Sequence, residues 1–357
     1  MDSMQSILLT GATGQLGSFL LAELLGCGRN PAFEGKIIAL KRSTSSNEQL
    51  QITARFFQKP GSWLESHPQI QWITVDLSDG IALADQLSSH VEGEITVIHA
   101  AAVIDINQGT SGNNPNVHLA QEALLMAEAI EAKHFTQVSS IAVMGNSAPL
   151  EEVTELGPND FQPNKNKEAL GTYAKSKIQS ELEVWRAHEE GLSVSIIRPG
   201  VILGVGPIDQ APQELWKRIW ANKLPVSTDG RSGVVDVRDV AGIVVHAHLG
   251  RILGPIIAVG SNPEFDTLLR GMASGLGLKR SFYKLNRNPW LNRMRRLDFL
   301  KSFPFIGRFF SASTRIMLFS RNTYDGSTGS ALIGEYTPLD RTLSSMGSMM
   351  GEVASGQ

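Results

Sequence analysis

Hydrophobic residues along the chain recur in two alternating patterns. Short runs rich in β-branched residues, such as SILLT and KIIAL, have the length of buried strands, and the stretches between them, such as LGSFLLAELLG, have the spacing of amphipathic helices. Repeated alternation of strand and helix predicts crossover units, and therefore a parallel sheet with helices on both faces. We expect strands at residues 6–10, 36–40, 71–75, 97–103, 135–143, 193–199 and 255–259.

The alternation weakens after residue 203, where Pro and Gly interrupt the pattern in LGVGPIDQAPQ. From residue 263 onward, helical spacing continues without clear strands. We therefore predict a main α/β domain of residues 1–203 and 234–260, the second part returning to the main sheet. Residues 204–233 and 261–345 would form a smaller substrate-binding cap, and residues 346–357 a flexible tail.

The composition narrows the class of protein. Of the 357 residues, 42% are hydrophobic and 19% charged, which is typical of a globular chain and not of a disordered one. The net charge of −3 argues against nucleic-acid binding. Cys27 is the one cysteine, so no internal disulfide can form, and a reducing cytoplasm is the compartment we expect. The opening MDSMQSILLTGATG has neither region of a signal peptide, and no apolar run reaches transmembrane length.

Basic residues concentrate in residues 279–321, where Asp298 is the single acidic residue. Basic and aromatic residues together, as in WLNRMRRLDFLKSFPFIGRFF, can serve a membrane surface or an anionic substrate such as an acyl-CoA. They can equally form a solvated face over a packed cap, balanced by acidic residues elsewhere. We favour the second interpretation and expect no membrane contact. Trp216 and Trp220, four apart on a predicted helix, we assign to the core of the cap.

Three glycines follow the first predicted strand. In ILLTGATGQLGSFLLAELL, Gly11, Gly14 and Gly17 lie between strand and helix, where glycine permits a sharp turn and a close approach of a pyrophosphate to the backbone. The helix then offers free N–H groups and the positive end of its dipole to phosphates. This predicts a dinucleotide site in a doubly wound, Rossmann-type sheet. The residues that we assign to it are Gly11, Thr13, Gly14, Gln15, Leu16 and Gly17.

The end of the second predicted strand, KIIALKRSTSS, indicates which dinucleotide binds. An NAD-selective fold usually has an acidic residue there, which accepts the ribose 2′-hydroxyl. This chain has Lys41 and Arg42, and a guanidinium can hold a 2′-phosphate through paired hydrogen bonds. We therefore predict NADPH in preference to NADH. A solvated basic loop is the alternative interpretation.

Two further strand ends carry candidate cofactor contacts. In VDLSD, we assign Asp76 and its neighbour Leu77 to the adenine, although Asp76 could also cap a helix, and we assign Asp79 to that cap. In VIHAAAV, we interpret His99 as a packed strand residue and not as a base. The small side chains that follow it leave space for a flat group against the backbone, at Ala100, Ala101 and Ala102.

A tyrosine and a lysine lie four residues apart in GTYAKSKIQSELEVW. Tyr173 and Lys177 would share one face of a helix. Free tyrosine ionises near pH 10, and a nearby ammonium lowers that pKa toward the range useful for acid–base catalysis. A hydroxyl that fixes the substrate oxygen is also needed. VSSIAVMG offers Ser139 and Ser140, of which strand alternation lets only one face the cleft.

These motifs together resemble the extended short-chain dehydrogenase/reductases. The matching segments are TGATGQLG, VDL, HAAA, VSSIAVMG, YAKSK, IIRPGVILG and VVDVRDVA, in the family's order over about residues 5–260. The resemblance selects Ser140 as the catalytic serine, five residues before Gly145, and makes Tyr173 the acid/base and Lys177 its partner. It also implies a catalytic role for Asn116. Further cofactor contacts implied at the nicotinamide end are Pro199, Val201 and Ile202.

The resemblance implies an NADP(H)-dependent oxidoreductase that reduces a ketone or aldehyde, or oxidises the alcohol. Members near this sequence look dihydroflavonol-reductase-like or 3β-hydroxysteroid-dehydrogenase-like, and the opening LTGATGQLGSFLLAELL also resembles thioester reductases. The alternatives are a nucleotide-sugar epimerase or dehydratase with bound NAD(P), and a non-catalytic NADP-binding regulator. Family members often dimerise through two helices, here near residues 116–132 and 171–190, and the apolar stripe LLMAEAI permits such a homodimer but would serve a core equally well.

Overall fold

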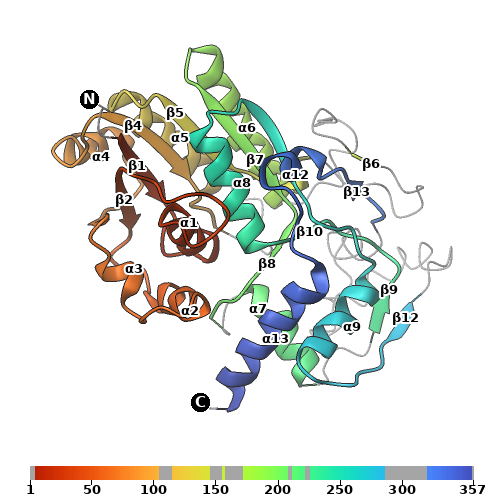
Figure 1. The fold of residues 1–357 in the computed structure, drawn as a ribbon. Helices are drawn as coiled ribbons and strands as arrows, with labels where there is room; N and C mark the ends of the chain where they lie inside the picture. The colour runs from red at the N-terminus through yellow and green to blue at the C-terminus, as the bar shows by residue number, and fades with distance from the viewer. Residues whose placement is uncertain are drawn as a thin grey trace, which may run out of the picture.

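The computed structural model describes residues 5–103, 115–144, 155–156, 172–207, 211–221, 226–285 and 320–355 (Figure 1). Its centre is a parallel sheet of seven strands in the order β11-β7-β5-β4-β1-β2-β3. All seven predicted strands are in this sheet, so the predicted doubly wound α/β fold is confirmed. The strands are β1 Gln5–Thr10, β2 Lys36–Lys41, β3 Ile70–Thr74, β4 Glu94–His99, β5 His134–Val138, β7 Val194–Pro199 and β11 Gly254–Ala258.

Successive residues of the strands face two separate hydrophobic cores. In β1, Ile7 and Leu9 lie in one core with Phe19, whereas Leu8 lies in the other with Val184. This alternation places helices on both faces of the sheet, which explains why the strands read as continuous apolar runs. The first face carries α1 Gln15–Leu24, α2 Glu48–Phe56, α3 Trp63–Ser66 and α8 Val237–Leu249, and the second carries α4 Gly80–Leu87, α5 Pro115–Ala129 and α6 Thr172–Glu189 (Figure 1).

Strands β4 and β5 end at His99 and Val138, before the predicted ends at residues 103 and 143. The neighbour of β4, strand β1, ends its pairing at Thr10, so the residues after His99 lose a ladder partner. After β5, the chain bends into the 3-10 helix η1, Ile141–Met144. The apolar residues beyond both strands therefore belong to the loops at the carboxyl edge of the sheet. The predicted ends of these two strands, at residues 103 and 143, were wrong.

The second half of the chain adds three small parallel pairs. Strand β8 (Val201–Leu203) pairs with β10 (Val234–Asp236), β9 (Val226–Thr228) with β12 (Tyr283–Leu285), and β6 (Glu155–Leu156) with β13 (Thr323–Tyr324). We expected no strands beyond residue 263, but pairs of two or three residues are too short to give a periodic pattern. Of the segment 234–260, β11 joins the main sheet and β10 does not.

Helices complete this half of the molecule: α7 Ala211–Trp220, α9 Phe265–Gly275, α12 Ser327–Ile333 and α13 Leu339–Ser355. Helix α13 packs along α9 (Figure 1) and extends through most of the segment in which we expected a flexible tail, because Met346 is buried in the core. Trp216 is buried as predicted, but Trp220 is 44% exposed, which corrects its assignment to the core. Among the described helices, none is both long and apolar enough to cross a bilayer.

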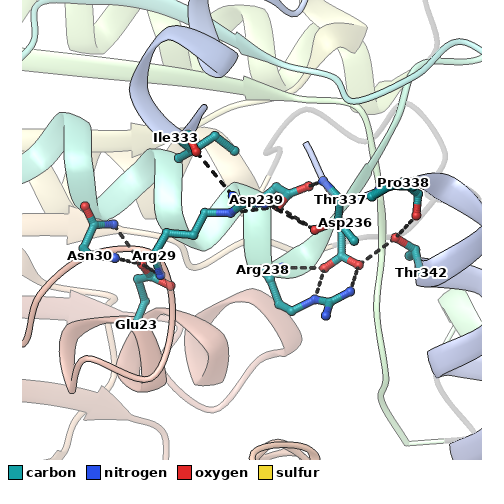
Figure 2. A network of polar contacts seen from close by, with 10 residues as sticks. All are labelled: Glu23, Arg29, Asn30, Asp236, Arg238, Asp239, Ile333, Thr337, Pro338 and Thr342. Carbon is teal, nitrogen blue, oxygen red and sulfur yellow. Dashed lines mark hydrogen bonds and ion pairs between the residues drawn. The ribbon is translucent and has the colours of Figure 1, made fainter. Parts of the chain in front are cut away.

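A polar network joins α12 and α13 to α8 and to the loop after α1 (Figure 2). Asp239, which is fully buried in the first turn of α8, pairs with Arg29 and accepts hydrogen bonds from the Thr337 backbone N–H (2.7 Å) and hydroxyl (2.9 Å). Asp236, at the N-cap of α8, accepts from Arg238 and from the Thr342 hydroxyl (2.7 Å). Two carboxylates on one helix therefore fix the last part of the described chain.

Most of the basic segment 279–321 lies outside the described residues, as does most of the loop 146–170. In the described part, Lys284 pairs with Glu264 (2.8 Å) and Arg321 with Asp229 (2.9 Å). Arg280 donates to the Trp220 carbonyl (2.9 Å). These contacts fit the interpretation that acidic groups elsewhere in the fold balance the segment.

Candidate active site

The glycine-rich loop turns tightly between β1 and α1. Gly11 has φ +73°, and a Cβ there would lie 2.6 Å from the Ala101 backbone N, so a side chain is excluded by both conformation and space. A Cβ on Gly17 would lie 2.0 Å from the Gly11 carbonyl oxygen. Gly14 is the N-cap of α1 and offers no side-chain cap. The first-turn N–H groups of α1 thus lie at the carboxyl edge of the sheet without a capping side chain.

This loop lies where the strand order reverses between β1 and β4, the position at which doubly wound sheets bind nucleotides. The Ala100 N–H donates to the Thr10 carbonyl (3.3 Å) and the Ala101 N–H to the Thr10 hydroxyl (3.2 Å), so the three alanines run directly beside the loop. Ala102 is exposed. A glycine cradle without room for Cβ atoms, an uncapped helix and small neighbours together fit a dinucleotide pyrophosphate.

The side chains of two loop residues, Gln15 and Leu16, point away from a phosphate. Gln15 donates to the carbonyls of Gly204 (2.8 Å) and Val205 (3.2 Å), in the loop after β8. The Leu16 side chain packs against the hydrophobic core, and Thr13 is half-buried. For Gln15 and Leu16, any contact with a phosphate would therefore come from the backbone.

The adenosine end of the site is open. The Lys41 ammonium, at the end of β2, lies 5.4 Å from the Trp72 ring centre. Arg42 is exposed, and its guanidinium makes no ion pair within the described part of the chain. Asp76 is exposed and Leu77 buried, and Asp79 caps α4 by accepting from the Ala82 N–H (3.0 Å), which confirms the predicted cap. A basic residue without a partner at this position is available to an anionic group.

Tyr173, Lys177 and Ser140 come together at the start of α6. The hydroxyls of Ser140 and Tyr173 share a hydrogen bond, and Ser140 Oγ also accepts from the Ala142 N–H (3.1 Å). Lys177 is 4% exposed and donates from Nζ to the Val138 carbonyl (3.1 Å) at the end of β5. Ser139 is buried, and its hydroxyl has no partner among the described residues. Of the two candidate serines, Ser140 is therefore the one that contacts Tyr173.

Burial is the largest cause of the pKa shifts of Tyr173, Lys177 and the neighbouring His99. It raises the pKa of Tyr173, and the hydrogen bond with Ser140 only partly opposes this. We expected Lys177 to lower the pKa of this tyrosine, so the net direction in the structure is the opposite one. Burial also lowers the pKa of Lys177 to about 8, although Glu181 raises it. The pKa of His99 falls to about 3 by burial and the nearby Lys177 charge, so His99 is neutral, packed and hydrogen-bonded to the Thr10 hydroxyl (2.8 Å).

Asn116 supports the site from α5. Its amide accepts from the Val103 N–H (2.7 Å) and donates to the Val103 carbonyl (3.0 Å), which fixes the segment after β4. It also donates to the Ser176 hydroxyl (3.4 Å) on α6. The asparagine thus connects the segment after β4 to α6, where Ser176 lies three residues after Tyr173.

The nicotinamide end predicted from RPGVILG begins at Pro199, the last residue of β7. Pro199 is buried, Ile202 is half-buried and Val201 is 51% exposed, so these residues offer a surface at the carboxyl edge. The turn is fixed by backbone hydrogen bonds from Gly200 to Ala258 (3.0 Å) and from Val201 to Gly233 (2.8 Å).

Sequence reasoning missed a buried ion pair beneath Lys177. Arg198 on β7 and Glu181 on α6 contact each other through 3.1 Å and 2.7 Å hydrogen bonds. A signal was present, since an arginine inside the apolar run SVSIIRP is rarely buried unless it is paired. Thr10 and Gln49 were also missed. Gln49 donates to the Val205 carbonyl (3.3 Å), which Gln15 also contacts.

The sequence model of one family matches residues 9–239, and its description is male sterility protein. The chain belongs to this family of extended short-chain dehydrogenase/reductases. At the level of class it is therefore an oxidoreductase with a nicotinamide cofactor. The match spans the glycine-rich loop, the serine pair, the Tyr173 helix and the start of α8.

Curated relatives include L-2-aminoadipate reductases from fungi. The large subunit from Eremothecium gossypii is 30% identical over 210 residues, which is 56% of this chain and 15% of that protein. The Saccharomyces cerevisiae enzyme is 27% identical over 298 residues, which is 78% of this chain and 20% of that protein. The chain thus spans a fifth or less of the length of these relatives.

Solved structures share the fold over almost the whole chain. The terminal R domain of the myxalamid PKS-NRPS pathway superposes with a TM-score of 0.74 at 21% identity, covering 100% of this chain and 92% of that one. The Bordetella bronchiseptica enzyme WbmH in complex with NAD+ gives 0.70 at 18% identity, covering 99% and 100%. At this identity the likeness shows the fold alone.

Proposed function

We propose that this oxidoreductase is an NADPH-dependent carbonyl reductase in which Tyr173 gives a proton to the substrate oxygen. One observation carries the proposal: Ser140 and Tyr173 share a hydrogen bond at the carboxyl edge of the sheet, with Lys177 held one turn further along α6. The bound nicotinamide would supply the hydride.

Each of the three side chains has a defined task in this reaction. Ser140 positions the carbonyl oxygen of the substrate and the Tyr173 hydroxyl in one hydrogen-bonded group. Tyr173 is protonated at neutral pH, because burial raises its pKa, so it can donate as negative charge develops on the oxygen. Lys177 places a buried positive charge on the same helix face, which stabilises the phenolate that remains after donation.

The preference for NADPH rests on the end of β2. Arg42 is exposed without an ion pair within the described part of the chain, and Lys41 lies beside it on the Trp72 ring. Two cations without a carboxylate at this position favour a 2′-phosphate over a 2′-hydroxyl. A preference for NADH would therefore require a carboxylate that this loop lacks in sequence.

An acyl thioester is a second candidate substrate beside ketones and aldehydes. The observation that favours it is the similarity to L-2-aminoadipate reductases and to the R domain of a PKS-NRPS pathway. A free carboxylate is a poor hydride acceptor, so reduction at this oxidation level needs an activated acyl group. Ser140 and Tyr173 would bind a thioester carbonyl as they bind a ketone carbonyl.

The test is NADPH consumption against a panel of flavonoid and steroid ketones, simple aldehydes and acyl-CoA thioesters. We expect consumption with at least one class, and Tyr173→Phe should lower turnover by about 10²–10⁴-fold while NADPH still binds. Tyr283→Phe is the matched control, because Tyr283 is 72% exposed and lies on β12, outside the main sheet.

Two outcomes would contradict the proposal. If Tyr173→Phe keeps full turnover, the proton comes from another group. If no substrate consumes NADPH although the cofactor binds, nucleotide sugars become the next panel, since epimerases and dehydratases keep and return the hydride. Binding without any turnover on both panels would favour a regulatory protein.

A further inference from the structure

A buried ion pair, Glu181 with Arg198, involves the residue one helical turn after the proposed catalytic lysine on α6. The side chains of Glu181 and Arg198 are 0% and 1% exposed. Arg198 Nε donates to one carboxylate oxygen of Glu181 (3.1 Å) and Nη2 to the other (2.7 Å). Charged residues are rarely buried this completely without a reason beyond stability, because burial of an ion pair often gives no net gain over apolar side chains.

The position of the pair relates it to Lys177. Glu181 follows Lys177 by four residues on α6, so both lie on the face that also carries Tyr173. Arg198 directly follows Ile197, the register partner of Val138, and the Val138 carbonyl accepts from Lys177 Nζ. Three buried charges therefore lie in sequence from the site inward: the ammonium, the carboxylate and the guanidinium.

We propose that Glu181 and Arg198 are positioning residues that act through Lys177. The Glu181 carboxylate stabilises the ammonium form of Lys177 in a site with little water. Arg198 occupies both oxygens of Glu181, so the carboxylate does not draw Lys177 Nζ away from the Val138 carbonyl. This inference rests on the proposed function, because it assigns the pair to the catalytic lysine of that reaction.

The other groups that face Lys177 leave Glu181 as the main charge acting on it. Tyr173 on α6 is neutral at ordinary pH, and His99 on β4 is neutral because burial depresses its pKa to about 3. Asn116 on α5 is uncharged. Burial lowers the pKa of Lys177 to about 8 and Glu181 opposes this, so the charge of this lysine is balanced close to neutral pH.

The decisive experiment measures the pKa of Lys177 directly, from the carbon-13 shift of its Cε in NMR spectra. Lys177→Arg identifies the resonance by its loss. We expect Glu181→Gln to lower this pKa by about one unit, because an attractive charge is removed. Arg198→Met should raise it by a similar amount, because Glu181 then has Lys177 as its nearest cation. Glu183→Gln, on the same helix but paired with Arg186 near the surface, should leave it unchanged.

Opposite shifts from two variants distinguish this role from a structural one. Both substitutions remove a partner from a buried pair and lower stability, so loss of fold would act in one direction. Shifts of the same sign, or no shift in folded protein, would overturn the proposal. If a single variant does not fold, the double variant Glu181→Gln with Arg198→Met removes both buried charges. It should still lower the pKa of Lys177, and an unchanged pKa there would also overturn the proposal.

Turnover then separates this inference from the proposed function. The alkaline limb of kcat/KM should move with the pKa of Lys177 in each variant. If the pKa moves as expected and the rate profile does not follow, the pair tunes Lys177 but the assigned reaction is wrong. If the pKa does not move while wild-type turnover depends on Tyr173, the function stands and the pair is structural.

Discussion

The two edges of the central sheet hold polar clusters of opposite character. At the carboxyl edge, Lys177, Glu181 and Arg198 are buried charges, and buried oxygens of Gln137 and Ser139 have no hydrogen-bond partner within the described part of the chain. Buried polar groups without a hydrogen-bond partner cost stability.

At the amino edge the cluster is neutral and complete. His134 contacts the hydroxyls of Ser193 (2.8 Å) and Ser195 (3.0 Å), and the ring of His248 lies 5.3 Å from that of His134. His248 itself contacts the hydroxyls of Thr136 and Thr96, both at 2.8 Å. Every ring nitrogen of the pair thus has a partner. Within the described residues, the buried ring nitrogens at the amino edge all have hydrogen-bond partners, whereas some buried oxygens at the carboxyl edge, where chemistry is proposed, have none.

The largest expected effect tests the carboxyl edge. Ser140→Ala should lower kcat by about 10²–10³-fold, since it removes a hydroxyl that organises the reacting oxygen. Ser139→Ala is the matched control, because Ser139 is the adjacent serine and its buried hydroxyl has no partner in the described residues. Turnover of both variants with the substrate from the panel decides this. An equal loss in both would remove Ser140 from the mechanism.

The next effect concerns the buried carboxylate of Asp239 in the first turn of α8 (Figure 2). Asp239→Asn should lower the free energy of unfolding by about 2 kcal/mol, because Asp239 is fully buried and its partner Arg29 is 30% exposed. Asp340→Asn, at an exposed position in α13, is the control. Urea denaturation measures both, and a loss no greater than that of the control would show that the network is dispensable.

A smaller effect is expected at the end of β2. Arg42→Ala should reduce the preference for NADPH over NADH roughly tenfold, the value of one charge-assisted hydrogen bond of about 1.5 kcal/mol. Arg55→Ala is the control: Arg55 is also exposed but lies on α2 and not at the end of β2, so the preference should stay unchanged. The ratio of kcat/KM values for the two cofactors is the measurement. An unchanged ratio in Arg42→Ala would mean that this loop does not read the 2′-position.

The last effect, which is small at any single pH near neutrality, tests the amino edge through pH. Burial lowers the pKa of His134 to about 4, and that of His248 falls well below its ordinary value through burial and the neighbouring His134 and Arg251. The unfolded chain binds these protons near pH 6.5, so the free energy of unfolding falls as pH drops from about 6.5 toward 4. His134→Gln should reduce this slope by up to about 1.4 kcal/mol per pH unit.

Urea titrations over that pH range measure the slope, and His118→Gln provides the control because its side chain is 53% exposed. A slope that does not change in His134→Gln would mean that the neutral cluster does not resist protonation. The two edges would then differ less than their hydrogen bonds indicate.

Much of the fold was predictable because its signals are local. Seven apolar runs became seven strands, and Asp79 caps α4, because strand length and capping chemistry are properties of neighbouring residues. The ends of β4 and β5 were not predictable, since they depend on where another strand turns away. The short pairs of β12 and β13 join segments far apart in the sequence and leave no period to detect.

For the site, spacing on one helix was informative and contacts between elements were not. Tyr173 and Lys177 could be found from their separation, and the structure places Ser140 against Tyr173. The Glu181–Arg198 pair and the upward pKa of Tyr173 both depend on burial across α6 and β7, which a single sequence does not display. The catalytic roles and the homodimer stay predictions. Leu125 on α5 and Leu182 on α6 are exposed, at 38% and 52%.

The raised pKa of Tyr173 also determines when solvent takes part in the proposed reaction. A phenol that is already protonated carries its own proton into the first turnover, so the chemical step needs none from water at that moment. A proton is taken up from the medium afterwards, when the Tyr173 phenolate beside Lys177 is reprotonated. With a pH indicator in a single turnover, proton uptake should therefore lag behind NADPH oxidation, and the length of that lag reports how well the closed site is isolated from water.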